Sequence, residues 1–186
     1  SYDRDPKAVD KLVAAGAINA RSVQEATSNI DALITCLPSP AACEEVMTGD
    51  GGALSSLAPG NCWIEMSTTD VDEMKRLALL AGEKSIDVLE CPATGGVHRA
   101  AKGQMTLLVG GDETLLHQYR PLLEIMSGQI VYMGEIGNAS LIKVVTNLLC
   151  LVDLVAMGEA LMLAKRGGLD LTRCYEAITA SSGSSR

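Results

Sequence analysis

Short apolar runs alternate with helix-type patterns over the first two thirds of the chain, and this alternation constrains the fold more than any other feature. Apolar runs of the buried-strand type cover residues 32–36, 62–66, 86–90, 105–109 and 129–133. Segments that begin with N-capping residues or proline separate these runs. Such an order is typical of βαβ units, which build a mainly parallel sheet. The sequence therefore predicts an α/β fold.

Capping side chains and prolines mark where the helices should begin. We expect helix starts near Asp5-Pro6, Ser22, Ala41, Ser67–Asp70, Asp112 and Pro121. The first of these helices should stop at Gly16. Because this helix begins at Asp5-Pro6, the strand that precedes it should end at or just before Ser1-Tyr2.

The pattern changes near residues 137–140. Residues 140–165 form one helical pattern of about 26 residues, roughly 39 Å long, that is apolar on nearly every face. Such a helix must be covered by other elements. Gly167-Gly168 ends it, and Asp170 caps a further helix to about Ala180. The sequence thus predicts two domains, an α/β part at 1–137 and the start of an all-helical part at 138–186.

Composition excludes several classes of function. The chain has 186 residues, of which 47% are hydrophobic, so it can bury a sizeable core. Its 15 basic and 23 acidic residues give a net charge of −8, and only 3% of its residues are aromatic, which argues against nucleic acid as a partner. No membrane span is expected, because Lys143, Asn147, Asp153 and Glu159 interrupt the most apolar stretch, and the polar N-terminus does not look like a secretory signal.

Cysteine and histidine usage points away from metal binding. The chain has six cysteines without a CxxC pair and two histidines, so sequence-local spacing assembles no metal site. We expect reduced core thiols and a cytoplasmic compartment.

Three loops follow strands at the sheet edge where α/β folds bind ligands. Two of them, Leu37-Pro38-Ser39-Pro40 and Met66-Ser67-Thr68-Thr69, also fit an ordinary turn and a helix cap. The third, Cys91-Pro92-Ala93-Thr94-Gly95-Gly96, suits a carboxylate, because adjacent glycines let backbone N–H groups approach an anion; a strand-ending turn is the alternative. The nearby Arg99 either pairs with an anionic substrate or is a solvated surface residue.

Lys143 and Asn147 lie four residues apart at the start of the long apolar helix and so share one face. Burial moves a lysine towards the acid/base behaviour that alcohol–carbonyl interconversion needs. The alternative is a lysine that extends to solvent at a helix start.

Six motifs in order resemble the β-hydroxyacid dehydrogenase family, especially its 3-hydroxyisobutyrate dehydrogenase-like members. They are Tyr2-Asp3-Arg4, Leu37-Pro38-Ser39-Pro40, Glu65-Met66-Ser67-Thr68, Pro92-Ala93-Thr94-Gly95-Gly96, Gly134-Glu135-Ile136-Gly137 and Lys143-Val144-Val145-Thr146-Asn147. The resemblance implies a Rossmann domain, a helical C-terminal domain and a nicotinamide cofactor. The implied reaction is hydride transfer between NAD(P) and a small β-hydroxy acid or its semialdehyde.

The resemblance also implies a role for each matching residue. Lys143 would be the catalytic acid/base, and Asn147 would position the substrate and Lys143. Thr94, Gly95 and Gly96 would hold the substrate carboxylate. The implied cofactor contacts are Leu37, Pro38, Thr68, Asp3 and Arg4. Asp3 favours the free ribose of NAD, whereas Arg4 could accommodate the 2′-phosphate of NADP; NAD is the expected cofactor.

The chain departs from the family pattern in four places. Thr94 replaces a usual serine, Ala139 a usual glycine and Thr146 an asparagine of several members, and the phosphate-binding G-x-G-x-x-G motif does not occur. We therefore expect a fragment whose first βα unit lies before Ser1 and whose later helices follow Arg186. The alternatives are a glyoxylate or succinic semialdehyde reductase, and a non-catalytic fragment that dimerises through the long helix. In either case a homo-oligomer is expected.

Overall fold

The computed structural model describes residues 1–183 and divides into two compact units, Ser1–Lys143 and the residues from Val144 onward. The first unit holds the sheet and its helices. Its elements are α1 (Pro6–Ala14), α2 (Val23–Ala26), β1 (Ala32–Thr35), α3 (Pro40–Thr48), the 3₁₀ turn η1 (Ala53–Ser55), β2 (Cys62–Glu65), α4 (Val71–Gly82), β3 (Asp87–Glu90), β4 (Ala93–Thr94), α5 (Gly96–Ala100), β5 (Met105–Gly111), α6 (Glu113–Met126) and β6 (Ser127–Gly134). The helix α7 (Asn138–Arg166) begins in this unit, and α8 (Leu171–Thr179) belongs to the second.

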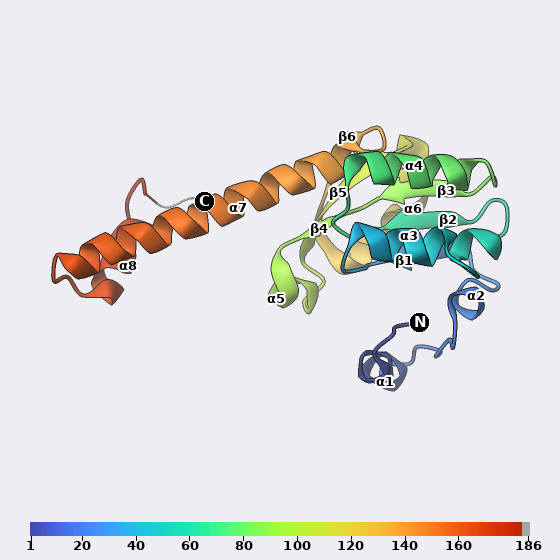
Figure 1. The fold of residues 1–186 in the computed structure, drawn as a ribbon, viewed down its shortest axis with the longest axis horizontal. Coiled ribbons are helices and arrows are strands. Elements are labelled where there is room, and N and C mark those ends of the chain that lie inside the picture. The colour runs from blue at the N-terminus through green and yellow to red at the C-terminus, as the bar shows by residue number, and fades with distance from the viewer. Residues whose placement is uncertain (184–186) are drawn as a thin grey trace. The chain divides into compact units, whose positions relative to one another are not determined.

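The sheet has the order β1-β2-β3-β5-β4, with β6 paired to β5 (Figure 1). β1, β2 and β3 run parallel in continuous register, and β6 runs parallel to β5. β5 is antiparallel to both β3 and β4. This is the Rossmann-like, mainly parallel α/β arrangement expected from the alternating pattern, and that prediction is confirmed.

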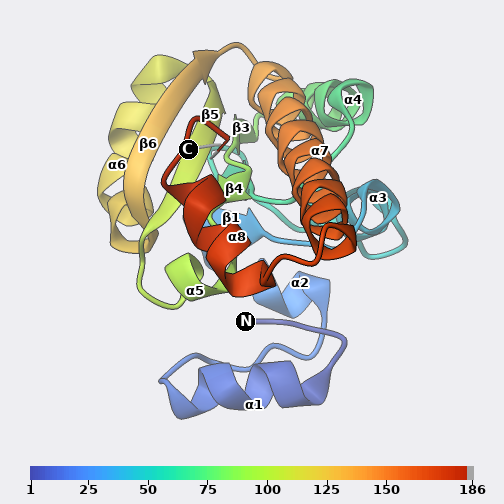
Figure 2. The same ribbon diagram turned by 90° about the vertical axis from the view of Figure 1, so that its left-hand side faces the viewer.

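Helices cover both faces of the sheet (Figure 2). α3 and α4 pack on one face around Trp63, and α6 packs on the other around Ile64. The two neighbours Trp63 and Ile64 thus serve opposite cores, because successive side chains of a strand point to opposite faces. All four residues of β2 are buried, as expected of a central parallel strand.

Helix starts follow the capping pattern of the sequence. Side chains of Asp5, Ser22, Ser39, Asp70 and Asp112 each accept a backbone N–H of the helix that they cap. Proline occupies the first turn of α1 and α3, where the missing N–H has no helical partner to lose.

The expectation of a new helix at Pro121 is wrong. Pro121 lies inside α6, which runs unbroken for 14 residues. The buried side chains Leu116 and Leu123 anchor the helix on both sides of the proline, and this packing outweighs the loss of one hydrogen bond.

The expected strand end at Ser1-Tyr2 is not part of the sheet. The Ser1 ammonium donates to the Ile18 carbonyl at 2.6 Å, and the Ser1 carbonyl accepts the Ala20 N–H at 2.8 Å. Ser1 therefore pairs with the loop that follows α1, and β1 is left as an edge strand of the described sheet.

The expectation of buried thiols holds for half of the cysteines. All six are free; Cys43, Cys62 and Cys91 are buried, whereas Cys36 and Cys150 are exposed and Cys174 is intermediate. Burial raises the pKa of Cys43 to about 11 and that of Cys62 to about 12, so these thiols stay protonated. Among residues 1–183 no cluster of His, Cys, Asp and Glu could hold a metal ion.

α7 is longer than the sequence pattern indicated. It spans 29 residues, and it is the one helix in the described part of the chain whose length and composition would allow it to cross a membrane. The charged residues that interrupt it are too sparse to exclude a span on composition, so that argument from the sequence is wrong. The core helix of a soluble protein meets the same criterion, and the absence of a membrane partner stays a prediction.

Candidate functional site

The three loops singled out from the sequence leave the same edge of the sheet. They follow β1, β2 and β3, which are parallel neighbours, so their carboxyl ends lie side by side. Backbone hydrogen bonds continue the pairing past the strands, from the Met66 N–H to the Thr35 carbonyl at 2.8 Å and from the Cys91 N–H to the Glu65 carbonyl at 2.6 Å. The loops therefore start from fixed positions.

A buried hydrogen-bond chain fixes the first two loops. The Trp63 indole N–H donates to Thr35 Oγ1 at 2.7 Å, and Thr35 Oγ1 donates to Glu65 Oε2 at 2.6 Å. The other carboxylate oxygen of Glu65 accepts the Ser67 N–H at 2.5 Å. Ser67 Oγ in turn accepts the Leu37 N–H at 2.7 Å, which joins the loop after β1 to the loop after β2.

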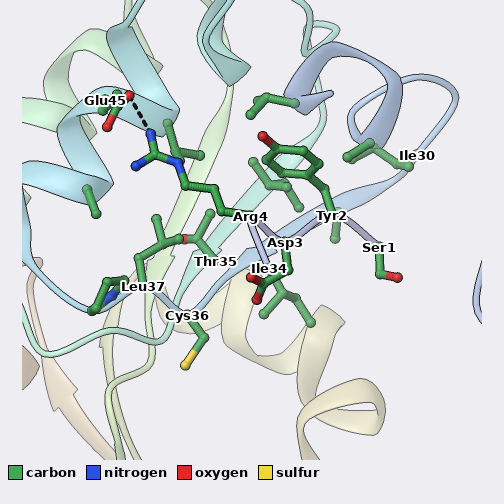
Figure 3. Close-up of a pocket in the computed structure, with 17 residues that line it drawn as sticks. Ser1, Tyr2, Asp3, Arg4, Ile30, Ile34, Thr35, Cys36, Leu37 and Glu45 are labelled. Atoms are coloured by element: carbon green, nitrogen blue, oxygen red, sulfur yellow. Dashed lines mark hydrogen bonds and ion pairs between the residues drawn. The ribbon is translucent and has the colours of Figure 1, made fainter. Parts of the chain in front are cut away.

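A cavity of about 420 Å³ opens beside β1. Four of the five residues predicted to contact a cofactor, Asp3, Arg4, Leu37 and Pro38, line it (Figure 3). Thr68, the fifth, is exposed and lies outside this lining. The lining is mostly apolar, with the charged groups at the end formed by residues 3–4 and α3.

The Arg4 guanidinium at this end is held by an ion pair. Arg4 Nη2 donates to Glu45 Oε1 of α3 at 2.5 Å, and both side chains are exposed (Figure 3). Asp3 Oδ1 accepts the Asp5 N–H at 2.8 Å, which orients that carboxylate. The pocket thus presents the Asp3 carboxylate and the Arg4 guanidinium side by side. Glu45 adds a second carboxylate, which the sequence analysis did not predict.

The Thr94–Gly96 turn joins β4 to α5: Thr94 ends the strand, Gly95 is the N-cap residue and Gly96 begins the helix. Thr94 pairs with Thr106 of β5, and Gly95 and Gly96 have φ values of +126° and +72°, which favour glycine. A Cβ on Gly95 would come within 2.8 Å of Arg99 Cδ, so the Arg99 side chain lies over the turn. Sequence reasoning did not predict β4 or α5, because a two-residue strand and a five-residue helix are too short for a periodic signal.

The predicted acid/base Lys143 is buried on α7, with 8% of its surface exposed. Ala139 and Ser140, which share its face of the helix, are buried as well. The first turn of α7 is anchored by the fully buried Glu90, which ends β3. Asn147 lies one turn further along α7 and is partly buried.

The sequence missed the carboxylates that hold this region together. Glu65 and Glu90 are register partners on neighbouring strands, and both are buried. A signal for them was present, since each is an acidic residue within or at the end of an apolar run and therefore needs several hydrogen-bond donors inside the protein.

Two family models match the chain. The model described as the NAD binding domain of 6-phosphogluconate dehydrogenase matches residues 1–134, and the model described as NAD-binding of NADP-dependent 3-hydroxyisobutyrate dehydrogenase matches residues 137–186. Together they account for nearly the whole chain.

Individual relatives agree with these matches. The NAD-dependent L-serine dehydrogenase of Pseudomonas aeruginosa is 36% identical over 98% of this chain and 61% of its own length. The structure of Mycobacterium tuberculosis 3-hydroxyisobutyrate dehydrogenase with L-serine is 32% identical, with a TM-score of 0.88 over 98% of this chain and 62% of that one. A structure of Psf3 with NADP⁺ and 2-OPP is 27% identical, with a TM-score of 0.92 over 99% of this chain and 65% of that one. The chain thus spans about three fifths of the length of the relatives that it matches.

Proposed function

The chain belongs to the 3-hydroxyisobutyrate dehydrogenase-like β-hydroxyacid dehydrogenases, and from this premise we propose that it carries out NAD(P)-dependent oxidation of a small β-hydroxy acid or reduction of its semialdehyde. The observation that carries the proposal is Lys143, a lysine buried on the first turns of α7. Burying a lysine side chain costs free energy, so a lysine at such a position suggests a functional role. The match to a dehydrogenase family supports the role of an acid/base for an alcohol substrate.

The residues present fit the adenosine end of a dinucleotide. The cavity beside β1 offers an apolar wall at Leu37 and Pro38 and a carboxylate at Asp3 that can accept ribose hydroxyls. Arg4 stands next to that carboxylate. We infer that this pocket holds the adenine ribose, that Thr68 contacts the cofactor from the neighbouring loop, and that the domain division lies at 137/138.

When bound, a nicotinamide cofactor would supply the hydride-transfer chemistry of the proposed reaction. As the neutral amine, Lys143 Nζ takes the hydroxyl proton during oxidation; as the ammonium, it gives a proton to the carbonyl oxygen during reduction. Asn147 orients the substrate and Lys143. Backbone N–H groups of Gly95 and Gly96, with the Thr94 hydroxyl, bind the substrate carboxylate and thereby fix the distance between the carbinol carbon and the cofactor.

The substrate is proposed from the relatives. L-Serine and 3-hydroxyisobutyrate, the acids in the names of the two relatives above, are both small β-hydroxy acids. Activity assays distinguish the candidate substrates. They use a panel of L-serine, 3-hydroxyisobutyrate, glyoxylate and succinic semialdehyde, each with NAD(H) and with NADP(H). We propose a cytoplasmic homo-oligomer.

A non-catalytic dimerising module is the second candidate, favoured by the exposed apolar side chains of α7 from Val144 onward. Titration with NADH and NADPH discriminates the two. Binding supports the dehydrogenase, and the absence of binding at millimolar concentration rejects catalysis by this chain.

Thr94→Val is expected to raise KM for the acid with little change in kcat, because the variant removes one hydroxyl from the proposed carboxylate site while keeping its shape. The rise should be about fivefold to tenfold. Thr106→Val is a matched control, since Thr106 pairs with Thr94 in the neighbouring strand. Steady-state kinetics on both variants test this, and an unchanged KM in Thr94→Val would remove Thr94 from the site.

Glu45→Gln is expected to strengthen the binding of a 2′-phosphate at the adenosine end. The ion pair with Glu45 neutralises Arg4 and places a second negative charge near the site, so its loss should improve the affinity for adenosine 2′,5′-bisphosphate about threefold to tenfold relative to AMP. Glu44→Gln is the control, because the neighbouring Glu44 pairs with Arg76 instead. Calorimetric titration measures the ratio; equal ratios in both variants would contradict a role for Glu45 in cofactor choice.

A further inference from the structure

The Glu90 carboxylate caps the N-terminus of α7 from the end of β3. Oε1 accepts the N–H groups of Gly137 at 2.6 Å and Ala139 at 2.9 Å. Oε2 accepts the Ser140 N–H at 3.1 Å and the Ser140 hydroxyl at 2.5 Å. Ordinary N-caps use a side chain next to the helix in sequence, whereas Glu90 is 47 residues away from Gly137.

The glycine at position 110 makes room for this contact. A Cβ on Gly110, the strand partner of Glu90 on β5, would lie 2.3 Å from Glu90 Oε1. Gly137 has a φ of +100°, and a Cβ there would come within 2.5 Å of Lys75 Cε. The absence of a side chain at Gly110 thus leaves the space that the Glu90 carboxylate occupies, and the absence of one at Gly137 leaves space for Lys75 at the helix start.

The energetic consequence is a rigid first turn. The first four N–H groups of a helix have no partner within the helix, and Glu90 satisfies three N–H groups at this start with a negative charge, which also interacts favourably with the helix dipole. Because Glu90 is fully buried, water cannot replace it there. Moving this turn would leave both the carboxylate and its donors unpaired.

Lys143 depends on this turn for its position. It follows Ser140 by three residues and lies on the same buried face of α7. Glu90 also starts the segment that leads, four residues later, to Thr94. The Glu90 side chain therefore fixes the start of α7, which carries Lys143, relative to β3, which leads into the proposed carboxylate-binding turn.

We propose that Glu90, together with Ser140, is a positioning residue that sets the place of Lys143 in the reaction by clamping the first turn of α7 to β3. The catalytic part of this inference rests on the proposed function. The structural part, that Glu90 controls the environment of Lys143, concerns this chain alone and is tested without substrate or cofactor.

The structural test is competitive acylation of lysines with acetic anhydride in Glu90→Gln, read by mass spectrometry against the exposed Lys84. Glutamine has the shape of glutamate, but its amide NH₂ faces donors where an acceptor is needed. We expect the Lys143/Lys84 ratio to rise about fivefold or more as the turn opens. Ser140→Ala, which loses a single bond to Glu90, should shift the ratio in the same direction by less, and it keeps the test valid if Glu90→Gln fails to fold.

Leu123→Ala is the control for destabilisation alone. Leu123 is fully buried on α6, in the core of the opposite sheet face. Its truncation should leave the labelling ratio within about twofold of the wild-type value. Labelling of Lys143 that is unchanged in both Glu90→Gln and Ser140→Ala, or that rises equally in Leu123→Ala, would overturn the proposed clamp.

The catalytic test is a double-mutant cycle with Lys143→Ala, assayed on the protein with NAD(P)⁺ and β-hydroxy acids. Glu90→Gln should lower kcat about tenfold or more with KM for the cofactor nearly unchanged. In the Lys143→Ala background the same substitution should have almost no further effect, because a positioning residue acts only through the group that it positions. Additive losses would show a general structural role and overturn the assignment. Normal turnover in Lys143→Ala alone would instead refute the proposed function, and the labelling result would still stand.

Discussion

Lys143→Ala is expected to lower kcat about 100-fold or more, because the variant removes the group that exchanges a proton with the substrate hydroxyl. The fold should persist, since alanine is the residue most compatible with a helix. KM for the cofactor should change little. Steady-state kinetics and thermal unfolding of the same samples measure both quantities.

Lys84→Ala is the matched control, because Lys84 is exposed in the turn after α4. Its kcat should equal that of the wild type. Chemical rescue adds a second criterion, since small primary amines in the buffer should restore part of the activity of Lys143→Ala and none of any other variant. Near-normal turnover in Lys143→Ala would be incompatible with the proposed acid/base.

Thr35→Val is expected to destabilise the protein by about 2–4 kcal/mol, although the side chain keeps its shape. The Thr35 hydroxyl stands between the Trp63 indole N–H and the Glu65 carboxylate, and all three groups are buried. Valine leaves the indole donor unpaired and removes one of the hydrogen bonds that stabilise a buried carboxylate. Denaturant unfolding measures the loss as a lower midpoint at constant m-value.

Thr69→Val provides a control of opposite sign. The Thr69 hydroxyl is the buried side-chain group without a hydrogen-bond partner in the described part of the chain. Its replacement by a methyl group should therefore leave stability unchanged or raise it by up to about 1 kcal/mol. If both threonine variants were destabilised equally, the hydrogen-bond chain through Thr35 would not be the cause.

Local signals predicted the elements of the fold well. The N-caps Asp5, Ser22, Asp70 and Asp112 act as expected, because capping depends on neighbours in sequence. Pro121 shows the limit of such signals: proline favours a helix start, but burial of the leucines on either side keeps α6 continuous. Tertiary packing therefore overrides a local preference where the apolar face is long enough.

The sequence indicated the loops of the candidate site, but not the carboxylates whose hydrogen bonds and ion pairs hold these loops in place. Leu37, Pro38, Asp3 and Arg4, which the family resemblance implied as cofactor contacts, line one cavity. Glu45, Glu65 and Glu90 could not be predicted as partners of Arg4, Thr35 and the α7 helix start, because each contact joins segments 30 or more residues apart. Such long-range pairs are set by strand register and helix packing, which a local pattern does not encode.

Transfer of deuterium from the carbinol carbon of a labelled β-hydroxy acid to C4 of a nicotinamide tests the central claim most directly. We predict that wild-type protein with NAD⁺ or NADP⁺ places the label at C4 for at least one acid of the panel, and that Lys143→Ala does so at a rate lower by about two orders of magnitude. Protein that binds the cofactor but transfers no label from any β-hydroxy acid, or that transfers it equally fast without Lys143, would contradict the claim.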